Sequence, residues 1–118
     1  MILHSDLKLI ANLSSRYAKQ IGMTGTEIFL STATFEKNLA HHPDVLLTDY
    51  DRLPHLISDP DVVIQDGERT LIATKDMAGL WLVAIKATQT GRGAFVTSFR
   101  RTTERDIARK LKQGTTLS

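Results

Sequence analysis

Hydrophobic positions near the start of the chain recur at three- and four-residue steps. This spacing predicts an amphipathic helix from Asp6 to Ile21, with its apolar face formed by Leu7, Ile10, Ala11, Tyr17, Ala18 and Ile21. The Gly22-Met23-Thr24-Gly25 stretch ends this helix. The next segment, Glu27-Ile28-Phe29-Leu30, is apolar, aromatic and β-branched, which predicts a short buried strand.

Three further helices are expected. One covers residues 33–41, with Thr32 or Ser31 as its N-cap, and Pro43 prevents its continuation. A short helix covers residues 50–57. The last covers residues 103–113, with a capping-box-like Thr103-x-x-Asp106 at its start and Gly114 at its end.

After Pro60 the pattern changes to strands. Residues 62–65 and 70–73 flank Asp66-Gly67, a strong hairpin signal, and a second hairpin joins residues 80–88 to 94–99. The expected order is therefore helix, strand, two helices, four strands and a closing helix. This order indicates an α+β fold with the helices packed on one side of an antiparallel sheet.

The register of the second hairpin follows from its apolar positions. Trp81, Val83 and Ile85 define one face, and Phe95 and Phe99 define another. The two sets share one core only if cross-strand partners have even-numbered sums, which requires an odd-length loop such as a three-residue turn. This register directs Lys86, Ser98 and Arg100 to the opposite face.

Composition narrows the class of protein. The 118 residues suit one domain, 1–118, which we divide into an N-terminal helix and linker (1–25) and a core (26–113). The absence of cysteine excludes disulfides, thiolate metal sites and a cysteine nucleophile. Charged residues interrupt the first 21 positions, so we expect neither a signal peptide nor a membrane span, and a cytosolic protein is the default.

Charge is distributed unevenly although the formal net charge is only +2. Residues 44–68 carry seven acidic side chains and one basic one, whereas residues 86–112 carry eight basic side chains and two acidic ones. Such a separation either attracts a polyanion or reflects pairing between the two segments, and the sequence favours neither.

The strongest chemical signal is the run from Ser98 to Asp106, where a strand end leads into a helix N-terminus. Backbone N–H groups and guanidinium groups in such a place can hold a phosphate and stabilise the charge that develops on its oxygens. Arg100 and Arg101 are the first candidates for that role. The alternative is that both are solvated or paired with the acidic segment.

Several short motifs occur together in one order. They are Leu30-Ser31-x-x-Thr34-x-x-Lys37, His41-His42-Pro43-Asp44, Tyr50, Pro60-Asp61-Val62-Val63 and Ser98-Phe99-Arg100-Arg101-Thr102. Over roughly residues 26–112 the chain resembles the phage branch of the barnase–EndoU–colicin E5/D–RelE (BECR) nuclease-like superfamily. The resemblance implies a helical N-terminal part, a four-stranded antiparallel sheet and metal-independent endoribonuclease activity, in domains found on phage head-associated proteins and as toxin tips.

Site residues can be carried over only where the motifs match, because active-site residue types vary within this superfamily. We take His41, His42, Ser98 and Arg100 as catalytic candidates, and expect substrate contacts from Thr34, Lys37, Lys86, Thr97, Arg101 and Arg105. Cleavage by the 2′-hydroxyl group needs a base, an acid and a cation, and either histidine can exchange the proton. The alternative for the histidines is that they lie at a helix end, where an imidazolium interacts favourably with the helix dipole. The alternative for Lys86 is that it simply lies on the solvated face of the sheet.

No metal or other cofactor is expected. A restriction-nuclease pattern needs a carboxylate where Ala84 stands, the acidic residues lack the spacing of a calcium loop, and no histidine pair has zinc spacing. Sequence-specific DNA reading is not expected either, because there is no helix-turn-helix signature. Trp81, Phe95 and Phe99 are interpreted as core residues and not as an exposed stacking platform.

Two functions from different classes remain open at this stage. The first is an endoribonuclease of phage or prophage origin, a hydrolase with toxin activity, acting on RNA such as tRNA in the cytoplasm. Its protein partner would be a cognate immunity protein. The second is a non-catalytic module, virion-associated through a phage head protein, whose basic surface binds nucleic acid or an acidic protein.

Overall fold

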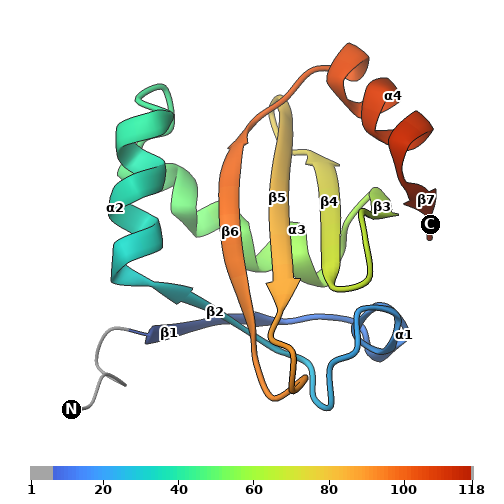
Figure 1. The fold of residues 1–118 in the computed structure, drawn as a ribbon. Helices are drawn as coiled ribbons and strands as arrows, with labels where there is room; N and C mark the ends of the chain where they lie inside the picture. The colour runs from blue at the N-terminus through green and yellow to red at the C-terminus, as the bar shows by residue number, and fades with distance from the viewer. Residues whose placement is uncertain (1–6, 118) are drawn as a thin grey trace.

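A computed structural model describes residues 7–117 (Figure 1). Along the chain its elements are β1 (Leu7–Asn12), α1 (Ser15–Gln20), β2 (Glu27–Ser31), α2 (Thr32–His41), the 3₁₀ helix η2 (Leu47–Arg52), α3 (Leu53–Ser58), β3 (Val62–Gln65), β4 (Thr70–Asp76), β5 (Leu80–Ala87), β6 (Ala94–Arg101), α4 (Glu104–Gln113) and β7 (Thr115–Thr116). Within this described part, no helix is long and apolar enough to cross a membrane.

All the strands belong to one mixed sheet. Its order is β1-β2-β6-β5-β4-β3-β7. Neighbours from β3 to β6 are antiparallel, and so are β1 with β2 and β3 with β7, whereas β2 runs parallel to β6. The expected four-stranded antiparallel sheet is therefore wrong. The protein has a seven-stranded mixed sheet, because β1, β2 and β7 extend the β3–β6 meander at its two edges.

The first predicted helix is also wrong in most of its length. Its first residue, Asp6, lies outside the described residues, and the following six form β1, which pairs with β2 from Leu7↔Ser31 to Asn12↔Glu27. Only residues 15–20 are helical, with Tyr17 and Ala18 buried. The apolar residues of this segment also fit an extended chain, and pairing along the edge of β2 outweighs the helical periodicity.

Other predictions are confirmed. The strands at 27–30, 62–65, 70–73, 80–88 and 94–99 are present within one or a few residues of their expected bounds. Ser31 caps α2 by accepting a hydrogen bond from the Thr34 N–H, and Thr103 caps α4 by accepting one from the Asp106 N–H. The helix expected over 50–57 is divided into η2 and α3.

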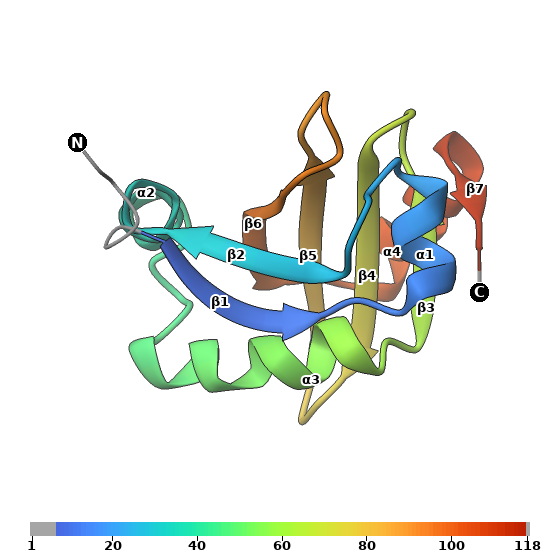
Figure 2. The same ribbon diagram turned by 90° about the horizontal axis from the view of Figure 1, so that it is seen from below.

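The main core lies between α3 and one face of the sheet (Figure 2). Leu53, Leu56 and Ile57 of α3 are fully buried, as are Trp81, Val83, Ile85 and Phe99 of the central strands. The Trp81 and Phe99 rings stack at 5.1 Å with an interplanar angle of 18°. The opposite face, which we call the site face, carries a smaller buried cluster of Ile64, Ile72 and Leu82.

A β-bulge in β6 changes which residues reach the site face. Val83 pairs with Phe99 and Ala84 with Ser98, in the predicted even-sum register, but Ile85 then pairs with Val96. Thr97 is therefore the extra residue of the bulge, and its hydroxyl donates to the Ala84 carbonyl at 3.2 Å.

The predicted placement of Phe95 in the core is wrong for this reason. Beyond the bulge, Phe95 pairs with Lys86 and shares the site face with it. The Thr88 N–H binds the Gly93 carbonyl at 2.9 Å, so residues 89–92 form an even-length loop and not the expected odd one. Lys86, Ser98 and Arg100 lie on the face opposite the core, as predicted. The predicted register and the observed register both place them there.

Candidate functional site

One end of α2 is held firmly against β6. The side-chain amide of Asn38 accepts from the Phe99 N–H at 3.0 Å and donates to the Phe99 carbonyl at 2.6 Å, and it also donates to the Tyr50 hydroxyl at 2.7 Å. α2 ends at His41, one turn after Asn38, and His42 is its C-cap. The two histidines are therefore positioned beside the bulged part of β6.

The first hollow in this region lies between α2 and β6. It has a volume of about 230 Å³ and is lined by Lys37, Asn38, His41, His42, Thr97 and Ser98. Five of these are site residues predicted from the sequence. Asn38 was not predicted, because an asparagine on a helix gives no signal before its strand partner is known.

A second, larger hollow lies where β6 leads into α4. It has a volume of about 570 Å³ and is lined by His42, Arg100, Arg101, Thr102, Thr103, Arg105, Asp106 and Arg109. His42 lines both hollows, so the hollow that contains Ser98 and the hollow that contains Arg100 meet at this residue. His42 is half-buried and His41 is exposed.

Asp106 engages two of these arginines. Arg100 donates to Asp106 Oδ2 at 3.0 Å, Thr102 donates to the same oxygen at 2.7 Å, and Arg109 donates to Oδ1. Partial burial raises the pKa of Asp106, but the hydrogen bonds from Thr102, Arg100 and Arg109 outweigh this effect and lower it to about 2. The carboxylate therefore stays charged at neutral pH and holds Arg100, which lines the second hollow.

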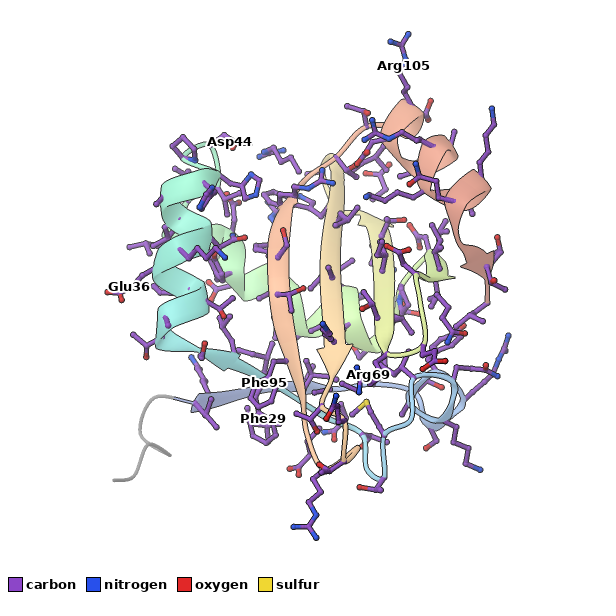
Figure 3. All side chains as sticks on the ribbon, viewed as in Figure 1. Phe29, Glu36, Asp44, Arg69, Phe95 and Arg105 are labelled. Atoms are coloured by element: carbon purple, nitrogen blue, oxygen red, sulfur yellow. The ribbon has the colours of Figure 1, made fainter. Side chains whose placement is uncertain are left out.

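Arg100 and Arg101 do not point the same way, because adjacent residues of a strand alternate between its faces. The Arg101 guanidinium lies over the Trp81 ring on the core side, 4.4 Å from its centroid. Both arginines line the second hollow, but the Arg101 guanidinium is held by the Trp81 ring and Arg100 by Asp106. Arg105 is exposed and points away from the molecule at the start of α4 (Figure 3).

Two predicted substrate contacts lie outside these hollows. Thr34 is in the first turn of α2 and accepts a hydrogen bond from the Ser31 hydroxyl at 3.0 Å. Lys86 lines a third hollow of about 360 Å³ on the site face, together with Arg69, Ala87, Thr88, Gln89, Phe95 and Thr97. Thr97 is common to the first and third hollows.

The charged residues of the two segments form ion pairs with other partners. In the acidic segment Asp59 and Asp61 pair with Lys75, and Asp49 pairs with Arg52. In the basic segment Arg100 and Arg109 pair with Asp106. Between residues 7 and 117 no ion pair joins one segment to the other.

The described residues contain no group of three or more histidine, aspartate or glutamate side chains arranged to hold a metal ion. Comparison of the chain with family models, curated proteins and solved structures finds no match. The geometry of the three hollows is thus the basis for any functional conclusion.

Proposed function

We propose that this chain is a metal-independent endoribonuclease-like domain of phage or prophage origin that acts at the junction of the first two hollows. The observation that carries the proposal is the position of His42, which lines the hollow containing Ser98 and also the hollow containing Arg100. A proton-exchanging group beside phosphate-binding donors is what metal-free RNA cleavage requires.

In the proposed reaction the 2′-hydroxyl oxygen of RNA attacks the adjacent phosphorus, and the bond from phosphorus to the 5′-oxygen of the next nucleotide breaks. One histidine of the His41–His42 pair removes the proton from the 2′-hydroxyl. The other histidine, or a water molecule, supplies a proton to the leaving 5′-oxygen. The products are a 2′,3′-cyclic phosphate and a free 5′-hydroxyl. Arg100 stabilises the negative charge on the non-bridging oxygens.

Ser98, Thr97 and Lys37 line the histidine hollow and are proposed to hold the sugar and phosphate of the nucleotide at the cleavage site. Arg101 and Arg105 at the second hollow are proposed to contact the phosphates beyond it. RNA, tRNA among its forms, is the proposed partner, in the cytoplasm or with the virion. An immunity protein would be needed if the activity is toxic to the host.

The experiment is cleavage of end-labelled tRNA and structured RNA in excess EDTA. Wild-type protein is expected to leave 2′,3′-cyclic phosphate ends, and His42→Ala to lower the rate by about 100-fold or more. Arg100→Gln should also lower it strongly. His55→Ala is the matched control, because His55 is an exposed histidine on α3 that pairs with Asp59 and lines none of the three hollows.

Binding of RNA without cleavage would overturn the nuclease proposal and favour the non-catalytic module. Cleavage that persists in both His41→Ala and His42→Ala would overturn the assignment of the site. Circular dichroism and thermal unfolding of each variant establish that the fold is retained, so that a lost rate reports on chemistry.

A further inference from the structure

Phe95, which lines the third hollow, belongs to an aromatic pair that the proposed function does not use. Phe95 of β6 and Phe29 of β2 are register partners in the parallel strand pair, and both are half-buried on the site face. Their ring centroids are 6.2 Å apart with an interplanar angle of 41°. Figure 3 shows the two rings together at the end of the sheet opposite Arg105.

Two cationic residues lie on the Phe95 side of this aromatic pair. Lys86 is the cross-strand partner of Phe95 and also of Thr70, and Arg69 directly precedes Thr70. Both cations line the same hollow as Phe95. An aromatic surface beside two cations can take a nucleobase on the rings and a phosphate on the cations.

The three hollows follow one another along β6, and neighbouring hollows share a lining residue. Thr97 joins the third hollow to the first, and His42 joins the first to the second. Strand rise places Phe95 about 15 Å from Arg100. A single polynucleotide strand lying along β6 would thus meet Phe95 and Lys86, then the histidines, and then Arg100.

The bulge at Thr97 makes this arrangement possible. Without the extra residue, Phe95 would occupy the same face as Phe99 and would be buried in the main core. With it, one strand presents Phe99 to the core and Phe95 to the site face. Phe95 and Phe29 thus form a half-buried aromatic pair on the site face, where a planar ring can stack.

We infer that Phe95, with Phe29, Lys86 and Arg69, is a nucleobase-stacking subsite that makes this domain specific for unpaired RNA. A base can stack on Phe95 only when it is free of its own strand's stack and of a pairing partner. This inference rests on the proposed function, because it assigns the substrate form that the same site would accept.

The test measures binding and cleavage separately. Binding is followed by the anisotropy of a 5′-fluorescein-labelled 2′-O-methyl RNA strand, which lacks the hydroxyl needed for cleavage, alone and annealed to its complement. Phe95→Leu is expected to weaken binding of the unpaired strand about tenfold and to leave the weaker duplex binding unchanged. Phe35→Leu, the same change at a half-buried ring that contacts Tyr50 away from this hollow, should have no effect.

Lys86→Gln is a second variant that does not depend on core packing, because Lys86 is exposed. It should weaken binding several-fold, whereas Lys19→Gln on α1, also exposed, should not. If Phe95→Leu does not fold, two other measurements test the stacking subsite. They are the comparison of Lys86→Gln with Lys19→Gln and the binding of Phe29→Leu.

The outcomes separate the two proposals. RNA cleavage by the wild type with unchanged binding in Phe95→Leu and Lys86→Gln overturns the stacking subsite and leaves the nuclease proposal in place. Binding that requires Phe95 without any cleavage overturns the nuclease proposal and retains the subsite. Equal affinity for the duplex and the unpaired strand, or no binding at all, overturns the subsite.

Discussion

Asn38 replaces a missing strand at one point of the sheet. β2 pairs with β6 only at Ala94 and Phe95, so the farther part of β6 has no strand on that side. The Asn38 amide, only 6% exposed, offers one acceptor and one donor to Phe99, as a neighbouring strand would. These bonds satisfy backbone groups that would otherwise be buried without partners.

Asn38→Ala should therefore be strongly destabilising. Loss of the amide leaves the Phe99 N–H and carbonyl buried and unpaired, which we expect to lower the free energy of unfolding by about 3 kcal/mol. Urea denaturation measures this change. Asn12→Ala is the control, because Asn12 is exposed and accepts from the Thr26 hydroxyl at 2.9 Å, and its effect should stay below about 0.5 kcal/mol. Similar losses in both variants would contradict this role.

At the scale of elements, Asp106 joins α4 to β6. Its backbone N–H takes part in the Thr103 cap, while its carboxylate binds Arg100 of β6 and Arg109 one turn further along α4. A single charged group thus connects the start of the helix, the end of the strand and the helix body. Asp106 thereby holds Arg100 in the lining of the second hollow.

The stability contributed by Asp106 should be lost in acid. Its folded-state pKa is lowered from 3.8 to about 2, so the carboxylate stabilises the fold above pH 4. This contribution falls as the pH drops from about 4 to about 2, where the folded form becomes protonated. Denaturant unfolding at a series of pH values measures it. Wild type should lose stability relative to Asp106→Asn across that range, and a constant difference between the two would contradict the prediction.

At the scale of the whole molecule, one loop contact connects segments far apart in the sequence. The Thr24 N–H and hydroxyl both donate to the Gly91 carbonyl, at 2.8 and 3.0 Å, so the β5–β6 turn is fastened to the loop between α1 and β2. Gly91 has φ +74°, and a Cβ atom there would lie 2.2 Å from the Gly22 carbonyl oxygen. Only glycine fits this contact.

Gly91→Ala is expected to lower the free energy of unfolding by about 3 kcal/mol, through backbone strain and displacement of the neighbouring loop. Gly25→Ala is the matched control in the contacting loop, because a Cβ atom at Gly25 meets nothing within 4 Å. Thermal unfolding of both variants measures how much each substitution lowers the stability of the fold. A Gly91→Ala protein as stable as Gly25→Ala would show that this contact is not needed.

Much of the candidate site was predictable because its residues occur in local signals. The Ser31 and Thr103 caps, the strand at 94–101 and the charged run after Ser98 depend on neighbours within a few positions. The proximity of His42 to Ser98 could not be predicted, because it depends on how α2 packs against β6. Arg69 could have been found by pairing the β4 and β5 patterns, since Thr70 lies opposite Lys86.

By itself the sequence determined the α+β class, the β3–β6 meander strands, the capped helices α2 and α4 and the uneven charge, because propensity, turn residues and periodicity act over short stretches. The tertiary structure alone decided that residues 7–12 form a strand, that β2 joins β6 in parallel, and that a bulge at Thr97 turns Phe95 outward. Each of these depends on hydrogen bonds to a distant strand, and the same local pattern is compatible with either outcome until that partner is in place.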